Sequence, residues 1–384
     1  MKFIVGCNDF KNLIGTTSRG LAKQPNAQIV MQITGNEQEP KIKITCQTGS
    51  SFFQGDIPIH SIDNFEEKVW GLEYDKIKSI ISVLPDTPTN LVFSTSDRDG
   101  QTLSLDYLGN HINIKFYENV QVPQLTGEIK TLGRVDSLLF MKSMGNMLKV
   151  VENNQVSIDL ATGCLHFSLE DNIIKTMATN RYAIAEMKID FEQEEETNFE
   201  QMKMLKLEQG SLLIKQPEAN EVLELIMIGN MFGYIDGEGI INVVTLADIR
   251  PLDYQPILSL ASDENFAMVE TGSLKTNLIN MGKLNQLEDE VILEASKENI
   301  FIKNRQDTLE INKVDNTEEL IANNLSEVHE LKFHRPTTMD IFGLLSTNLV
   351  RLEWGTPGKL VRFVTLDKDN QPIENLIVGV SVHG

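Results

Sequence analysis

The stretch MATNRYAIAEM, residues 177–187, places a tight polar turn between two apolar, alternating runs of sequence. Thr179 and Asn180 supply turn chemistry, because short polar side chains bond to the neighbouring backbone. An Asn-Gly pair would give a tighter hairpin than Arg181 and Tyr182 do. The stretch therefore predicts two strands joined by a turn that is either a solvated loop tip or the floor of a binding site.

The chain has 384 residues, which predicts two or three domains rather than one. A hydrophobic content of 41% is ordinary for a globular protein. No apolar run approaches the roughly 20 residues that span a membrane, so no membrane partner is expected. The start, MKFIVGCNDF, is too short in its apolar part for a signal peptide and predicts a first strand.

Cysteine and histidine are few and scattered. Three cysteines without CxxC spacing indicate neither a zinc site nor a disulfide framework, and a reducing cytoplasm is the simplest setting. No histidine pair has HExxH spacing, so no metal and no cofactor is expected. The residues are Cys7, Cys46 and Cys164, with His60, His111, His166, His329, His334 and His383.

Three stretches share a pattern of strand, short helix and strand, namely 71–96, 206–229 and 330–355. In the second, the pattern predicts a helix over 212–216 and a strand over 222–228. In the third, it predicts a strand over 349–354 after a helix that opens at Pro336. Apolar stripes at helical spacing lie at Ile77, Ile80, Ile81 and Leu84, before Pro85, and at Thr338, Ile341, Phe342 and Leu345.

A second kind of helix is predicted at the opening of each repeat, over 8–23, 133–149 and 272–284, with Asn8 as an N-cap. The expected apolar faces are Phe10, Leu13, Ile14 and Leu21; Leu138, Met141 and Leu148; and Leu274, Leu278 and Met281. Strands are predicted over 27–34, 41–48, 102–108, 111–117, 156–160, 240–245, 290–296, 299–304 and 308–314.

The pattern repeats about every 130 residues and resets at two Pro-bearing stretches, 121–129 and 250–258. The sequence therefore predicts an α+β protein of three tandem domains of similar plan, with two helices packed on antiparallel sheets in each. The predicted domains are 1–125, 126–256 and 257–384. The acidic stretch 190–201 is interpreted as a solvated loop.

Positive charge concentrates in the predicted helices. The segments 8–23, 74–84, 134–149, 203–216, 272–283 and 332–346 hold 15 basic and five acidic residues, a net charge of +10 in a chain of net charge −21. Lysine is a good helix former, but glutamate is equally good and occurs only once in these segments. The helices are therefore predicted to share a surface that meets a polyanion, with contacts suited to duplex phosphate rather than to stacked bases.

Three tandem α+β segments with basic helix faces resemble the bacterial DNA sliding clamps, the beta subunits of DNA polymerase III. The resemblance covers the whole chain. MKF with a helix over 8–21 matches the family's start, and MATNRYAIA is similar to its A-T-D-G-H-R-L-A turn. VPQL resembles the F-P-x-L joint into the middle domain, and RPLDYQPIL resembles the F-P-D-Y joint into the last one.

The resemblance implies a cytoplasmic DNA polymerase processivity factor without catalytic activity. Two chains would form a homodimeric ring around double-stranded DNA, in a bacterium or, for a phage-encoded clamp, in the host cytoplasm. The helices would line the hole, loaded by a clamp loader, and bind DNA without sequence specificity. The DNA-facing residues would be Lys11, Arg19, Lys76, Lys78, Arg134, Lys142, Lys149, Lys215, Lys275 and Lys283.

The resemblance also implies a pocket for peptides of the replicative polymerase and of other clamp-binding proteins. Its residues would be Thr179, Arg181, Tyr182, Leu252, Asp253, Tyr254, Pro256, Ile257, Val378 and Val380. An apolar slot with a few polar anchors suits an extended peptide. The dimer contact would involve Ile112, Ile114 and Leu284, although each residue also suits an ordinary core position.

The chain departs from the family at two places. The turn lacks the family's Gly-His before the arginine and is one residue shorter, and the end LIVGVSVHG replaces M-P-M-R-L. Both changes predict altered partner peptides. An enzyme is disfavoured because no Walker loop, GxGxxG or GxSxG motif occurs. An acidic structural or interaction protein with a clamp-like fold that does not encircle DNA is the alternative, and the charge segregation argues against it.

Overall fold

The structure is a computed structural model of the 384-residue chain. It describes residues 1–22, 27–95, 101–151, 160–194, 202–218, 220–258, 260, 262–284, 289–317, 320–355, 360–367, 369 and 376–381. The chain packs as two compact units. Unit 1 comprises Met1–Leu138, Glu192–Glu194 and Leu212–Leu246, and unit 2 comprises Leu139–Phe191, Glu195–Ser211 and Ala247–Gly384.

Unit 1 is built on one 14-stranded antiparallel sheet, in the order β14-β10-β16-β17-β18-β4-β3-β2-β6-β9-β8-β7-β1-β5. Its strands are β1 (Lys2–Gly6), β2 (Gln28–Gly35), β3 (Pro40–Gln47), β4 (Ser51–Pro58), β5 (Ser61–Asp63), β6 (Val69–Glu73), β7 (Asn90–Thr95), β8 (Thr102–Tyr107), β9 (Asn110–Tyr117), β10 (Ile129–Asp136), β14 (Glu192–Gln193), β16 (Val222–Ile228), β17 (Met231–Ile235) and β18 (Ile241–Thr245). Pairing of β18 with β4 joins strands that are far apart in sequence into one sheet.

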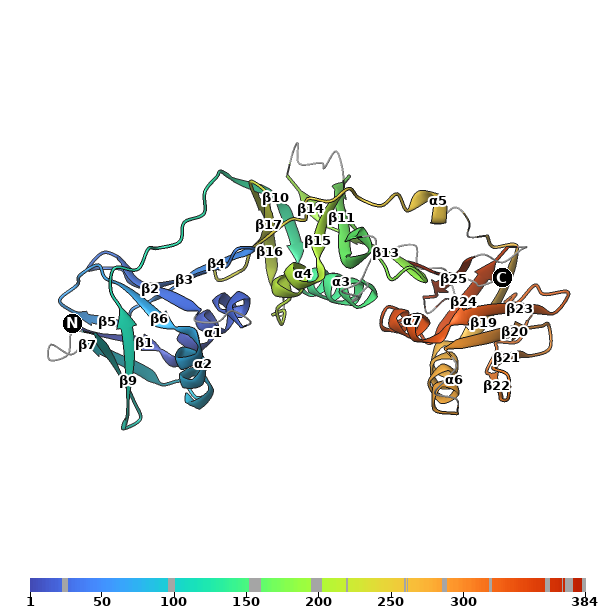
Figure 1. The fold of residues 1–384 in the computed structure, drawn as a ribbon, viewed down its shortest axis with the longest axis horizontal. Helices are drawn as coiled ribbons and strands as arrows, with labels where there is room; N and C mark the ends of the chain where they lie inside the picture. The colour runs from blue at the N-terminus through green and yellow to red at the C-terminus, as the bar shows by residue number, and fades with distance from the viewer. Residues whose placement is uncertain are drawn as a thin grey trace. The chain divides into compact units, whose positions relative to one another are not determined.

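Two helices of unit 1 cover the same core (Figure 1). They are α1 (Cys7–Thr17), followed by the short helix η1 (Arg19–Leu21), and α2 (Tyr74–Val83). Their apolar residues recur at helical spacing and are buried as predicted, with Ile81 half-buried. Stacked aromatic rings fill the core beneath them, with the Phe3 and Phe93 centroids 5.1 Å apart.

Unit 2 contains an eight-stranded sheet, β15-β11-β12-β13-β26-β25-β24-β19, and a four-stranded sheet, β22-β21-β20-β23. The strands are β11 (Cys164–Glu170), β12 (Ile173–Thr179), β13 (Ala183–Asp190), β15 (Lys203–Lys206), β19 (Asn265–Glu270), β20 (Glu290–Ala295), β21 (Ile300–Lys303), β22 (Thr308–Ile311), β23 (His329–His334), β24 (Leu349–Trp354), β25 (Leu360–Thr365) and β26 (Leu376–Ser381). Here β13 and β26 form the pairing between distant parts of the chain.

The remaining helices are α3 (Ser137–Val150), η2 (Leu160–Gly163), α4 (Leu207–Leu213), α5 (Gln255–Leu258), α6 (Thr271–Leu284), α7 (Arg335–Asp340) and η3 (Ile341–Gly343). The predicted stripes of α6 and α7 are buried. The predicted strands over 222–228 and 349–354 are confirmed at both ends. The α+β class with helices on antiparallel sheets is therefore confirmed.

The helix predicted over 133–149 begins too early. Gly133–Asp136 belong to β10, which pairs with β16, and α3 starts at Ser137. With this start, Leu138 faces outward and is 58% exposed, so its predicted place on the apolar face is wrong. The buried face consists of Phe140, Met141, Met144, Met147 and Leu148.

Three smaller predictions also need correction or fall outside the described residues. The helix predicted over 212–216 is α4, which ends at Leu213. Asn8 lies inside α1, because the extended residue Gly6 is the N-cap. The strand predicted over 156–160 lies outside the described residues except Leu160, which begins η2, and the acidic stretch is described only to Glu194.

Candidate functional site

The turn between β12 and β13 is closed by its own side chains. Thr179 Oγ1 donates to the Ala183 carbonyl at 2.8 Å and accepts the Arg181 N–H at 3.1 Å. Asn180 Oδ1 accepts the N–H groups of Tyr182 at 3.3 Å and Ala183 at 2.8 Å. Arg181 has φ +73°, a left-handed conformation that short turns impose, and its side chain is exposed. The predicted turn is confirmed, and its tip is held by four hydrogen bonds from two side chains.

The tip is also attached to α7. The Tyr182 ring stacks on the His334 ring, with centroids 4.6 Å apart and planes 18° apart. Asn180 Nδ2 donates to Asp340 Oδ2 at 3.3 Å. Sequence reasoning missed His334 and Asp340, because nothing in their local sequence links them to a turn in another part of the chain.

Burial raises the pKa of the Asp340 carboxyl above its ordinary value. The hydrogen bond from Asn180 and the charge of His334 both favour the carboxylate and offset only part of this effect. The group beside the turn is therefore a carboxyl that releases its proton less readily than an exposed aspartate.

The segment that follows residue 250 packs against the hairpin formed by β12 and β13. Tyr254 is 3% exposed and clusters with Met177 and Ile184, with Leu252 packed beside them. The Tyr254 ring also meets the His166 ring edge-on at 5.0 Å. Further along, Asp253, Pro256 and Ile257 are exposed, so they are the accessible part of the predicted wall.

The last strand, β26, pairs with β13 of the hairpin. Its two predicted pocket residues, Val378 and Val380, lie on the face of the sheet opposite to Ile184. Val380 lies opposite Ala183 and Val378 opposite Ala185, and directly opposed residues share a face. Ile184, which Tyr254 contacts, points to the opposite face because side chains alternate along a strand. Val378 and Val380 are fully buried and lie on the other face of the sheet from the Tyr254 contact, and their predicted place in the pocket stays a prediction.

Seven of the ten predicted DNA-facing residues have exposed side chains. Lys76 and Lys78 lie on α2, and the other helical ones are on α3 and α6. Arg134 is exposed on strand β10 rather than on a helix. The full set is Lys76, Lys78, Arg134, Lys142, Lys149, Lys275 and Lys283.

The other three predicted basic residues make contacts around a polar cleft of about 400 Å³ in unit 1. Lys215 is 8% exposed and pairs with Glu221, and with Asp236 at 3.2 Å. Arg19 donates to the Ile214 carbonyl at 3.0 Å, and Lys11 pairs with Asp86. Lys215 is thus paired with two carboxylates inside the protein, and its predicted contact with DNA stays a prediction.

The predicted contact residues between subunits differ in accessibility. Ile114 is 1% exposed within the core of unit 1, so its side chain suits the ordinary core position, and a contact near it stays a prediction. Ile112 is half-buried against the same core. Leu284, the last residue of α6, is 55% exposed.

Within the described residues, no helix is long and apolar enough to cross a membrane. In the same part of the chain, no group of three or more His, Cys, Asp or Glu side chains could hold a metal ion. Cys7, Cys46 and Cys164 are buried free thiols.

No protein-family model and no curated protein matches the sequence. Solved structures do match. The DNA polymerase sliding clamp from Pseudomonas aeruginosa is 12% identical with a TM-score of 0.81, covering 100% of this chain and 99% of that chain. The beta clamp of Helicobacter pylori bound to a DNA ligase peptide is 14% identical with a TM-score of 0.74, covering 100% of both chains. Over its whole length, this chain therefore has the fold of the bacterial DNA polymerase III beta sliding clamps.

Proposed function

We propose that the chain is a DNA polymerase processivity factor, a sliding clamp that encircles duplex DNA and acts as a non-enzymatic tether. The observation that carries the proposal is the match of fold along the entire chain to structures of bacterial clamps. The exposed lysines of α2, α3 and α6 support it, since phosphate contacts by lysine are independent of base sequence.

The ring is proposed to consist of two chains, each with domains 1–125, 126–256 and 257–384. Six domains of similar plan close by twofold symmetry. Leu284 is exposed at the end of α6 and suits an intersubunit contact. In the described residues, β9 pairs with β6 only at Phe116 and Tyr117, which leaves the rest of that edge for a second chain.

Partner peptides of the polymerase, the clamp loader and other replication proteins are proposed to dock at the β12–β13 turn. The Helicobacter pylori clamp was solved with a DNA ligase peptide bound. In this chain, Thr179, Arg181 and Tyr182 would offer polar anchors and a flat ring, and Leu252, Tyr254 and Ile257 the apolar wall. Asp253 and Pro256 lie at the exposed rim.

The alternative, an acidic interaction protein that has the clamp fold without encircling DNA, is less well supported. Such a protein has no need for lysines on the outer faces of three helices while the chain as a whole carries a charge of −21.

The decisive experiment measures topological retention. The chain is loaded by its clamp loader onto a nicked circular plasmid and then passed through a sizing column at a salt concentration that disrupts ionic contacts. A clamp stays with the circle and is released once a restriction enzyme linearises it. Retention on linear DNA, or no retention on circles, contradicts the proposal.

A further inference from the structure

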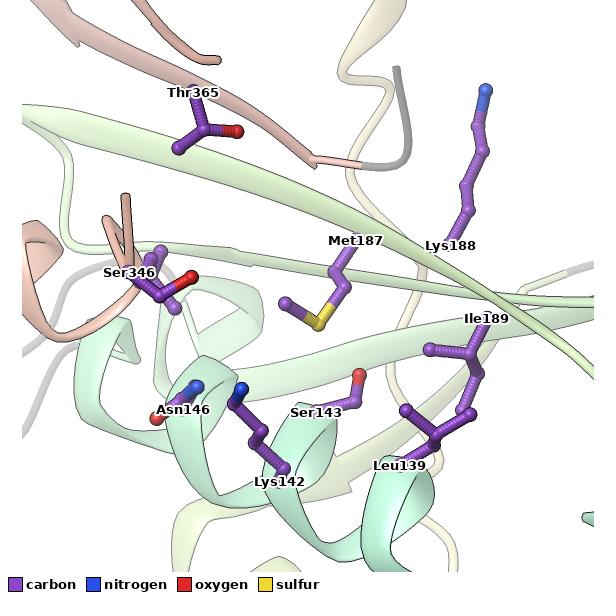
Figure 2. Close-up of a pocket in the computed structure, with 10 residues that line it drawn as sticks. Leu139, Lys142, Ser143, Asn146, Met187, Lys188, Ile189, Ser346 and Thr365 are labelled. Atoms are coloured by element: carbon purple, nitrogen blue, oxygen red, sulfur yellow. The ribbon is translucent and has the colours of Figure 1, made fainter. Parts of the chain in front are cut away.

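A cavity of about 190 Å³ lies in unit 2 between α3, β13 and the segment after η3 (Figure 2). It opens on the face of β13 that carries Met187 and Ile189, since side chains alternate along a strand. Ile184, which contacts Tyr254, lies on the other face. The cavity is therefore separate from the proposed peptide site.

One side of the cavity is formed by hydrogen-bond donors. Lys142, Ser143, Asn146, Ser346 and Thr365 all line it. Figure 2 shows the Lys142 ammonium and the Ser346 hydroxyl directed toward a common space, whereas Ser143 is buried and its Oγ lies 3.4 Å from Thr176 Oγ1. Because Lys149 Nζ donates to Asn146 Oδ1 at 3.2 Å, the Nδ2 group of Asn146 remains to face Lys142.

Thr365 belongs to the buried part of the lining. The residue is 1% exposed, and within the described part of the chain its Oγ1 makes no hydrogen bond. Because the Oγ1 atom itself is almost completely inaccessible, this hydroxyl is not among the groups that can reach a bound molecule.

Among the residues that the structure describes, no carboxylate lines the cavity. Among the ion pairs between described residues, none involves Lys142, whereas Lys188 next to the cavity points away and pairs with Glu186 at 3.5 Å. The Lys142 ammonium therefore lies beside other hydrogen-bond donors and has no carboxylate partner among the described residues. Such a group of donors favours the binding of an anion.

The opposite side of the cavity is apolar, formed by Leu139, Met187, Ile189 and Leu344. Leu344 is buried, and Leu139 is 49% exposed at the rim. A volume of about 190 Å³ is that of roughly six water molecules at their share of the liquid. A bare inorganic anion would leave this apolar wall unused.

We infer that the cavity binds a small organic carboxylate with a short aliphatic or aromatic body. The carboxylate accepts from Lys142, Asn146 and Ser346, and the body packs on Met187 and Ile189. A free metabolite and the C-terminal residue of a peptide both offer this chemistry. The inference does not depend on the proposed clamp function.

The test uses the full-length protein labelled at the methionine methyl groups and observed by NMR. The Met187 resonance is assigned with Met187→Leu, and sodium benzoate is the probe. We expect a saturable shift of the Met187 methyl, with binding about tenfold weaker or more in Lys142→Gln, since a charge-assisted hydrogen bond is lost. The matched control is Lys275→Gln, an exposed lysine of α6 outside the cavity lining, which should bind benzoate as the wild type does.

Three comparisons decide the result. Neutral benzamide and inorganic phosphate should both bind much more weakly than benzoate. Thr365→Val, which removes a hydroxyl that does not reach the bound molecule and nearly keeps the shape of the side chain, should bind benzoate as the wild type does. Equal binding of benzamide, equal binding of phosphate, or full affinity in Lys142→Gln overturns the inference. The source of the carboxylate is then tested with N-acetylglycylleucine and its C-terminal amide. If only the free acid binds, the natural ligand is the C-terminal residue of a peptide. If neither binds while benzoate does, the natural ligand is a free metabolite.

Discussion

Two strand pairings connect parts of the chain that are far apart in sequence, and we call them the first and the last joint. Ion pairs lie beside the first joint, whereas stacked rings and a hydrogen bond lie beside the last. The first joint is the pairing of β4 with β18 in unit 1, beside which Lys215 holds Glu221 and Asp236, and Arg19 bonds to the Ile214 carbonyl. The last joint is the pairing of β13 with β26 in unit 2. It is supported by the stacked rings of Tyr182 and His334 and by the bond from Asn180 to Asp340.

The two joints differ in the pKa of a carboxyl group, which is Glu221 at the first joint and Asp340 at the last. Burial alone would raise the pKa of Glu221, but hydrogen bonds from Lys215 and Ser137 outweigh it, and the pKa is lowered. Burial dominates at Asp340, and its pKa is raised. At the first joint Glu221 is therefore fully compensated, although burial raises the pKa of the nearby Glu238. At the last joint Asp340, beside the proposed peptide site, is a poorly compensated carboxyl.

The largest effect is expected at the first joint. Lys215→Met leaves the carboxylates of Glu221 and Asp236 buried without their cation, which costs about 3–5 kcal/mol in the free energy of unfolding. Urea unfolding followed by circular dichroism measures it. Lys76→Met, at an exposed site of α2, is the matched control and should change the free energy of unfolding by no more than about 0.5 kcal/mol. Equal losses in the two variants would contradict the role assigned to Lys215.

Much of the fold could be predicted from periodicity. The faces of α1, α2 and α6 follow from apolar residues at helical spacing, and β16 and β24 from short apolar runs bounded by turns. The start of α3 could not, because nothing in the local sequence separates Gly133–Asp136 from the helix that follows, and these residues form a strand by pairing with β16. Tertiary pairing here sets the boundary of the helix.

The sequence predicted where the candidate site lies along the chain, but not which side chains reach it. The turn carries its own chemistry in Thr179 and Asn180, so its existence follows from local sequence. The face that Val378 presents depends on the register of β26 against β13, and the burial of Lys215 depends on Asp236 from another strand end. Such facts are set by three-dimensional neighbours that a linear pattern does not contain.

A second prediction concerns binding at the last joint. Tyr182→Ala removes the ring that stacks on His334 and forms part of the proposed peptide floor, and a buried anchor of this kind contributes about 2 kcal/mol, or a roughly thirtyfold change in Kd. The measurement is calorimetric titration with the clamp-binding peptide of the polymerase from the same organism. Lys215→Arg, at the first joint, serves as the control and should keep full affinity. Unchanged binding in Tyr182→Ala would place the peptide site elsewhere.

The polar support of the last joint should contribute less to folding than the ionic support of the first. Asn180→Ala removes the acceptor for two backbone N–H groups of the turn and the donor to Asp340, with an expected loss of about 1–2 kcal/mol. Thermal unfolding of the variant beside Lys215→Met gives the comparison directly. A loss in Asn180→Ala that exceeds that of Lys215→Met would reverse the ranking of the two joints.

The smallest effect is a dependence on pH at Asp340. Its pKa in the folded chain lies above the ordinary value of 3.8, so the folded state holds the proton more tightly than the unfolded state. The resulting stabilisation is fully present below pH 3.8 and is lost as the pH rises through the raised pKa. Asp340→Asn keeps an acceptor for Asn180 and does not titrate, so its stability relative to the wild type should increase from pH 4 toward neutrality. Unfolding midpoints across this range measure the trend, and the carboxyl ¹³C shift of Asp340 gives its titration midpoint. A midpoint at or below 3.8 would mean that Asn180 and His334 compensate burial fully, and the two joints would then no longer differ in this respect.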